Sequence, residues 1–245
     1  MKPKRQYRAV FFDAGGTLFK PHPSVGHIYA RVARKYGMHV DEEKVEQIFH
    51  QEFSKRDKEI SIKAHASEEN EKEWWRELVR FVFSQVVHLK RFDEFFEELY
   101  DVFATAETWK LYPEVIPVLE ELRKRHLILG IVSNWDSRLF SICESIGVKK
   151  YFDFILASAV VGSAKPDQGI FKEALKKANV APSETIHVGD SVDNDFFGAK
   201  RVGIHAVLIS RNGHGGDGVM AVDSLTRLIA LVDGEGLTGK KNDAT

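Results

Sequence analysis

The feature that most constrains the fold of this chain is a set of short apolar runs, each of which ends in polar residues. The first run, Ala9–Phe12, leads directly into Asp13 and a glycine pair, a pattern that predicts a buried strand followed by a tight turn. Four later runs have the same character and are also expected to be strands: Leu127–Val132, Phe152–Ser158, Thr185–Val188 and His205–Ile209.

Segments with helical spacing of apolar residues lie between these runs. They cover Pro113–Arg125, Ser137–Ile146, Gln168–Ala178 and Asn194–Val202. Strands that alternate with helices predict an α/β fold with a doubly wound parallel sheet, covered by helices on both faces. In such sheets, ligands bind beyond the carboxyl ends of the strands. The polar residues at those ends are therefore the first candidates for a functional site.

The stretch 21–105 interrupts this alternation. Its apolar spacing predicts helices at Ser24–Tyr36, Asp41–Lys58, Glu69–Val87 and Asp93–Phe103. A connection between parallel strands needs only about a dozen residues, so we expect this stretch to be an inserted all-helical domain. The predicted division is a core of residues 1–20 and 106–233, a helical domain of residues 21–105 and a loose polar tail of residues 234–245.

The composition excludes several classes of protein. A formal net charge of -1 argues against nucleic acid as a main partner. No segment reaches the roughly 18 apolar residues that a membrane span needs, and no signal peptide follows the basic start. We therefore expect no membrane partner and a cytoplasmic location. The single cysteine, Cys143, excludes an intramolecular disulfide and lies in an apolar helical pattern that predicts burial. The choice between monomer and homodimer stays open.

Carboxylates follow two of the predicted strands. Asp13 follows the first, and the turn GDSVDND after the fourth carries Asp190, Asp193 and Asp195. Each turn alone has an ordinary explanation, because an aspartate before glycines commonly forms a turn and Asp193 suits the first turn of a helix. If Asp13, Asp190 and Asp195 converge, however, their mutual repulsion requires a cation. Hard oxygen ligands of this kind suit Mg²⁺.

Hydrogen-bond donors follow the second and third strands. Ser133 and Asn134 supply a hydroxyl and an amide that can donate to substrate oxygens. Lys165, which precedes Pro166, would place positive charge beside the carboxylates and attract an anionic substrate. Each of these residues alone is also typical of a turn, a helix cap or a surface loop. Their common position at strand ends is what predicts a site.

Taken in order, the segments DAGGTL, SN, KP and GDSVDND resemble the four motifs of the haloacid dehalogenase-like hydrolase superfamily. The resemblance spans the whole chain and implies a Rossmann-like core with a helical cap between the first two motifs. The segments DAGGTLF, WWRELV, SNWDSRL and KPDQGIF resemble most closely the group called haloacid dehalogenase-like hydrolase domain-containing protein three.

The resemblance also implies a role for each candidate residue. Asp13 would attack a small phosphorylated substrate and form an aspartyl-phosphate, with Lys165 as the second catalytic residue. The substrate-binding residues would be Thr17, Ser133, Asn134 and Lys165. The ligands of Mg²⁺ would be Asp13, the backbone carbonyl of Gly15, Asp190 and Asp195, the last of these directly or through water.

Position 15 departs from the pattern of the superfamily. Most of its phosphatases carry there a second aspartate, which serves as general acid and base, whereas Gly15 has no side chain. Loss of a general acid lowers a rate by a factor of about 10² to 10⁴. We therefore expect a weak or leaving-group-selective phosphatase. A histidine of the cap, His22 or His27, is a candidate replacement for the missing proton donor.

Two other functions stay open. The segment DAGGTLF also resembles the first motif of 2-haloacid dehalogenases, but a carboxylate that displaces halide needs no cation, so Asp190 and Asp195 argue against that reaction. A protein-binding module with a vestigial metal site would also explain Gly15.

The cap is expected to close over the site and exclude water. Its many aromatic residues predict mainly the core of a helix bundle. The charged run Glu68–Glu73 predicts a solvated face of a helix.

Overall fold

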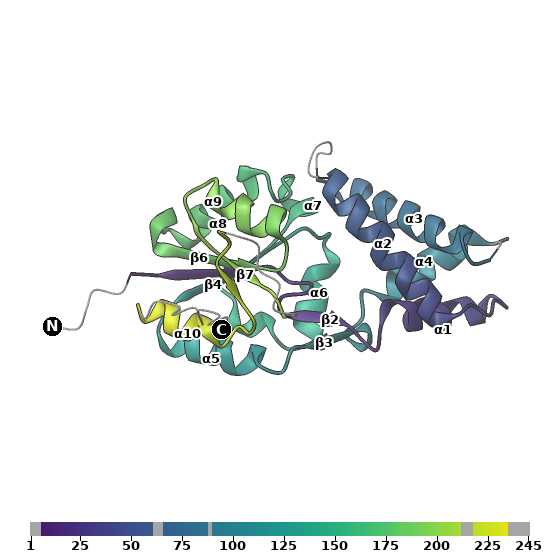
Figure 1. The fold of residues 1–245 in the computed structure, drawn as a ribbon, viewed down its shortest axis with the longest axis horizontal. Coiled ribbons are helices and arrows are strands. Elements are labelled where there is room, and N and C mark those ends of the chain that lie inside the picture. The colour runs from purple at the N-terminus through teal and green to yellow at the C-terminus, as the bar shows by residue number, and fades with distance from the viewer. Residues whose placement is uncertain (1–5, 61–65, 88–89, 212–217, 235–245) are drawn as a thin grey trace, which may run out of the picture.

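A computed structural model describes residues 6–60, 66–87, 90–211 and 218–234, and its centre is a six-stranded parallel sheet (Figure 1). The strand order is β5-β4-β1-β6-β7-β8. The strands are β1 (Ala9–Phe12), β4 (Ile128–Ser133), β5 (Phe154–Ala157), β6 (Thr185–Gly189), β7 (His205–Ile209) and β8 (Ala221–Val222). The predicted α/β fold with a Rossmann-like parallel sheet is thus confirmed, and five of these strands lie where the apolar runs placed them.

Helices cover both faces of the sheet (Figure 1). One face packs against α5 (Val115–Lys124), α6 (Arg138–Ser145) and α10 (Arg227–Val232), and the other against α8 (Gln168–Ala178) and α9 (Gly198–Lys200). Alternate residues of β1 point to opposite faces, so Val10 joins the first layer and Phe11 the second. Every residue of β1 is buried, as the continuous apolar run predicts for a central strand.

Shorter elements complete this part of the chain. They are α7 (Ser158–Val161), the 3₁₀ turns η1 (Ala106–Thr108), η2 (Lys149–Tyr151) and η3 (Pro182–Glu184), and the π-helical turn η4 (Val192–Phe197). The helix predicted at Asn194–Val202 is therefore wrong in its start, because the chain first makes the wider turn η4 and only then enters α9. Cys143 is buried in α6, as expected.

Between β1 and β4 the chain forms four further helices, which we call the helical insert: α1 (Val25–Lys35), α2 (Glu42–Ile60), α3 (Glu68–Ser84) and α4 (Phe92–Val102). The hydroxyls of Ser24 and Ser67 cap α1 and α3 at their first turns. The insert has its own cluster of buried apolar side chains, separate from those of the sheet. It lies beyond the end of β1, beside the sheet (Figure 1).

An antiparallel pair of short strands joins the insert to the sheet. β2 (Phe19–Pro21) pairs with β3 (Trp109–Leu111), so the chain leaves and re-enters the core at one place. The sequence did not predict this pair, because FKP and WKL contain no apolar run of strand length. The predicted boundaries of the helical domain fall close to this pair and stay a prediction, and the predicted tail lies almost wholly outside the described residues.

No helix among the described residues is both long and apolar enough to cross a membrane.

Candidate active site

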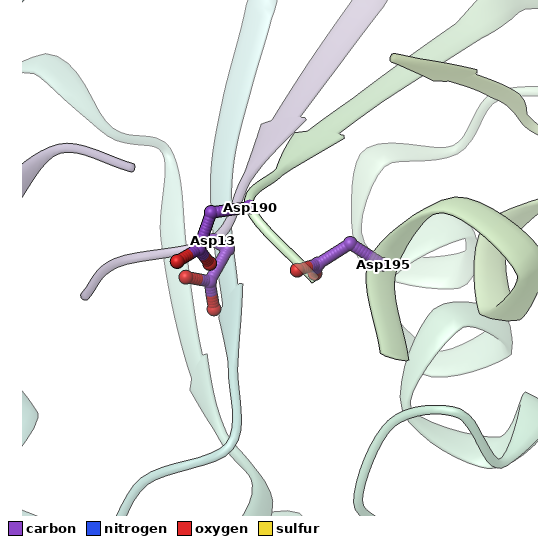
Figure 2. A group of neighbouring side chains, drawn as sticks. All are labelled: Asp13, Asp190 and Asp195. Atoms are coloured by element: carbon purple, nitrogen blue, oxygen red, sulfur yellow. The ribbon is translucent and has the colours of Figure 1, made fainter. Parts of the chain in front are cut away.

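Three aspartates converge at the carboxyl ends of β1 and β6 (Figure 2). The two strands are neighbours with Phe12 opposite Val188, so Asp13 and Asp190 emerge side by side. Asp195 approaches from η4. One carboxylate oxygen from each aspartate lies within 4.8 Å of the other two, a spacing that suits ligands of one metal ion. The three aspartates thus lie close together, which is the condition under which the sequence predicted a cation site.

Lys165 lies between two of these carboxylates. Its ammonium Nζ donates to Oδ1 of Asp13 at 2.6 Å and to Oδ1 of Asp195 at 2.5 Å. Burial disfavours the charged ammonium, but the attraction of the two carboxylates outweighs this and raises the pKa of Lys165. The lysine is therefore a permanent positive charge inside the site.

One lysine does not neutralise three aspartates. Burial and the nearby charge of Asp195 raise the pKa of Asp13 in spite of Lys165. Asp190 as a whole residue is exposed, but its carboxyl group faces the site. Loss of solvent around this carboxyl and repulsion from Asp13 and Asp195 raise its pKa well above the usual range. A divalent cation would relieve both effects.

Asp195 has partners for both of its oxygens. Oδ1 accepts from Lys165 and from Nε2 of His187 at 2.8 Å, and Oδ2 accepts from the backbone N–H of Ser191 at 3.1 Å. Burial opposes ionisation of Asp195, but Lys165 and His187 outweigh it and lower its pKa. Because these protein groups occupy its oxygens, Asp195 is better placed to reach a metal ion through water than directly.

The hydrogen bonds to Asp13 leave one of its oxygens free. Ser133 Oγ donates to Oδ1 at 2.9 Å, the same oxygen that Lys165 contacts. No described residue donates a hydrogen bond to Oδ2. Asp13 is thus fixed through one oxygen and has the other available for attack or for a cation.

Asn134 positions Lys165. Its amide Nδ2 donates to the Lys165 carbonyl at 2.9 Å, and its Oδ1 accepts from the Lys165 N–H at 2.7 Å. This pair of bonds ties the end of β4 to the loop after α7. A hydrogen bond to substrate would have to come from the second N–H of the amide.

Glycines allow the carboxylates to approach so closely. A Cβ on Gly16 would lie 2.1 Å from Oδ2 of Asp190, and one on Gly189 would lie 2.1 Å from Cγ of Asp195. At Gly15, a Cβ would lie 3.1 Å from Cζ3 of Trp135, so this aromatic ring occupies the direction in which a side chain would point. The Gly15 carbonyl accepts no hydrogen bond from the described backbone or side chains and is available to a ligand.

Thr17 has a fully buried hydroxyl with no partner in the described part of the chain. An unpaired buried hydroxyl costs about 1–3 kcal/mol, so its retention favours a ligand that completes the bond. Arg211 holds the same turn, because its Nη2 donates to the Thr17 carbonyl at 2.7 Å while its guanidinium stacks on Tyr112.

The other residues considered from sequence have different places. His27 Nδ1 lies 2.9 Å from Glu42 Oε2 within the insert, and His22 is exposed beside β2. Asp193 is exposed in the first turn of η4, the position expected of it, while Ser191 is the N-cap. Neither histidine forms a hydrogen bond with Asp13.

Sequence reasoning missed His187, Trp135 and Arg211. Arg211 follows β7, so the rule that polar residues at strand ends form the site would have found it. His187 is a polar residue inside an otherwise apolar strand, a signal that only its contact with Asp195 explains. Trp135 directly follows Ser133 and Asn134, but nothing in the sequence indicates that its ring lies against Gly15.

Comparisons with known proteins agree with the geometry. The family model of the haloacid dehalogenase-like hydrolases matches residues 7–203. The chain is 34% identical over 212 residues to the haloacid dehalogenase-like hydrolase domain-containing protein 3 of Mus musculus, a match that covers 86% of this chain and 84% of that protein.

Two solved structures are also similar. A HAD phosphatase from Thermococcus onnurineus has 28% identity and a TM-score of 0.66, with 93% of this chain and 99% of that chain covered. A 2-haloacid dehalogenase from Pseudomonas syringae pv. Tomato has 23% identity and a TM-score of 0.64, with 94% and 100% covered. The second likeness is one of fold alone.

Proposed function

The chain belongs to the haloacid dehalogenase-like hydrolase family, as its motifs indicated, and we propose that it is a magnesium-dependent phosphatase of a small phosphorylated metabolite. The observation that carries the proposal is the convergence of Asp13, Asp190 and Asp195 around a single buried lysine. A dehalogenase would need no cation, and the surplus negative charge of this site would hinder its carboxylate nucleophile.

Asp13 is the proposed nucleophile. Its free oxygen attacks the phosphorus, the bond to the leaving-group oxygen breaks, and an aspartyl-phosphate forms. Lys165 and Ser133 hold Asp13 and lie where they can bind the oxygens of the transferred group, with Thr17 as a further donor. Water then attacks the phosphorus, which releases phosphate and restores the carboxylate.

The residues present fit Mg²⁺. Asp13, Asp190 and the Gly15 carbonyl would hold it, with Asp195 acting through water, and the ion would supply charge neutralisation during transfer. The chain's own contribution is to fix Asp13 through Oδ1 and to keep the lysine at 2.6 Å from it.

Gly15 supplies no general acid. Trp135 lies against this glycine, so no other side chain takes that place. The leaving group must therefore depart with a proton from water, and substrates with good leaving groups react fastest. His27 forms a hydrogen bond with Glu42, and His22 is exposed beside β2. We therefore propose neither histidine as the proton donor to the leaving group.

We further propose that the helical insert is the cap of this enzyme, that its substrate is a small molecule and that it works in the cytoplasm. The insert lies beyond the carboxyl end of β1, where it can cover a substrate bound at Asp13 (Figure 1).

The test is turnover of an activated aryl phosphate and a panel of metabolite phosphates, with and without Mg²⁺. The wild type should release phosphate only with the metal, and Asp13→Asn should lose at least about 10³-fold in rate. Asp193→Asn, an exposed neighbour in η4, is the matched control and should keep its activity.

Halide release from a 2-haloacid without Mg²⁺, and no phosphate release, would instead identify a dehalogenase. If Asp13→Asn changes no reaction at all, the chain is a binding module rather than an enzyme.

A further inference from the structure

A cavity lies between the helical insert and the core. Its walls come from all four helices of the insert and from β2, β3 and the start of α6. The space open to the centre of a water-sized sphere is about 70 Å³, several times the roughly 10–15 Å³ that one water molecule needs. The cavity is therefore large enough for a compact chemical group and too small for a long chain.

The cavity adjoins the loop of the proposed nucleophile. Trp135 lines it, and the same ring lies against Gly15, two residues after Asp13. Trp135 also contacts Trp109 with ring centroids 5.2 Å apart, and Trp109 lines the cavity from β3. Trp135 is therefore shared by the wall of the cavity and the turn that follows Asp13.

The walls carry no free charge. Arg138 is the one charged side chain among the lining residues, and its guanidinium donates to both oxygens of Asp136 and stacks on Tyr100 at 3.4 Å. Asp136 is itself fully buried and also accepts from the Tyr100 hydroxyl at 2.7 Å. Because this charge is already paired, a second anionic group on the substrate would find no partner here.

Aromatic side chains make up most of the walls of the cavity. Tyr29 is 2% exposed and lines the cavity, and no hydrogen bond joins its hydroxyl to any described residue. Its neighbours are aromatic, with Phe49 at 5.8 Å and Phe103 at 5.9 Å between ring centroids. Walls made mainly of aromatic side chains favour a planar aromatic occupant over an aliphatic or polyhydroxylated one.

We propose that this cavity binds an uncharged, single-ring aromatic group on the alcohol side of the substrate. The enzyme would then act on phosphate monoesters of compact aromatic alcohols in preference to sugar phosphates or substrates with a second charge. This inference rests on the proposed function and adds the substrate class to it.

The test compares benzyl phosphate with glycerol phosphate, two alkyl phosphates that differ in the group offered to the cavity. Binding of benzylphosphonate and of 2-hydroxyethylphosphonate with Mg²⁺ is measured beside it by calorimetry. The aromatic member of each pair should be favoured by about 10- to 100-fold, the gain expected when one ring leaves water.

Val79→Phe, on the wall of the cavity, should abolish this preference while retaining activity on glycerol phosphate. Val160→Phe, an equal enlargement at a 55% exposed site on α7, should leave the preference unchanged. A variant that fails to fold loses both activities together, so the ratio between substrates separates misfolding from a filled cavity.

Equal affinity of the wild type for both phosphonates, or no binding of either, would overturn the proposal. Tight binding of benzylphosphonate without hydrolysis of any phosphate would support the cavity and refute the phosphatase.

Discussion

The candidate active site of the core contains buried charged side chains, whereas the interior of the helical insert is mainly aromatic. In the core, the side chains of Lys165 and Asp195 are each only 2% exposed and lie in direct contact. In the insert, the pair of Lys72 and Glu97 has side-chain exposures of 37% and 46%, and the interior is aromatic. The core thus retains buried charge that can act on a substrate, whereas the insert offers apolar surface that can select one.

The contrast also appears in how the two regions are stabilised. Buried charges are costly unless every one is paired, and the core pairs Asp195 with three donors. The insert depends on ring contacts, such as Phe83 with Phe95 at 4.6 Å. Substitution of a charge at this site should therefore cost more than substitution in an exposed ion pair of the insert, such as Lys72 with Glu97.

Lys165→Met should give the largest effect. It removes the cation between Asp13 and Asp195, so we expect the free energy of unfolding to fall by about 3–5 kcal/mol. Lys72→Met in the insert should change it by less than about 1 kcal/mol. Urea unfolding without metal measures the free energy of unfolding of both variants. Equal decreases in the two variants would contradict the difference that we infer between the two regions.

Gly15→Asp introduces the general acid that the site lacks. The new side chain would meet Trp135, so the rate on glycerol phosphate should rise less than about tenfold in the single variant. In the double variant with Trp135→Ala, the restored acid should raise that rate by about 10² relative to Trp135→Ala alone. Steady-state kinetics measure both, and a large gain in the single variant would show that Trp135 is no obstacle.

Two carboxylates of the insert are withdrawn from solvent: Glu52, which is 7% exposed and accepts from Arg56 Nε at 2.7 Å, and Glu71. The sequence predicted a solvated face at Glu68–Glu73, but Glu71 is half-buried and accepts from Trp75 at 3.2 Å. Burial and repulsion from Asp136 raise its pKa from 4.5 to about 7. Folding therefore favours the protonated form, and ionisation destabilises the folded state progressively between these values, with the full penalty above pH 7.

Glu71→Gln should accordingly increase the free energy of unfolding at pH 8 by about 1–3 kcal/mol and change it little at pH 4. The measurement is a denaturant series at several pH values. Glu69→Gln, exposed on the same helix, is the control and should show no such pH dependence. A constant difference across the pH range would contradict the assignment to Glu71.

The smallest effect concerns the metal. Repulsion and loss of solvent raise the pKa of Asp190, whereas a metal ligand must be deprotonated. Affinity for Mg²⁺ should thus increase with pH by at most about tenfold per unit while Asp190 titrates, with release of a proton. Calorimetry in buffers of different ionisation enthalpy measures the protons released; uptake of protons would refute the assignment.

The sequence predicted most of the sheet because central parallel strands are apolar on both faces and so form continuous runs. It missed β8, whose two residues Ala221–Val222 are too short to stand out, and the pair β2 and β3, which is stabilised by its mutual hydrogen bonds. The start of the helix near Asn194 was misplaced because the pattern cannot separate a π-helical turn from an α-helix.

For the site, position after the predicted strands singled out Asp13, Ser133, Lys165 and Asp195, and hydrogen bonds link Ser133 to Asp13, Asp13 to Lys165 and Lys165 to Asp195. The structure places Lys165 in the loop after α7 and Asp195 in η4, so the rule holds only loosely for these two. Their partners could not be found in the same way. The bond of His187 to Asp195 and the contact of Trp135 with Gly15 depend on the packing of side chains from different elements. Local pattern carries no information on such contacts.

The pairing of Pro21 with Trp109 has a consequence for how proteins with this core can evolve. Paired strands lie about 4.8 Å apart, so a short turn could close the core at this point if the intervening segment were deleted. A different segment of any length could be accommodated there, provided that its two ends lie side by side. Recombination at this single junction would exchange one specificity for another while the reactive machinery stays intact.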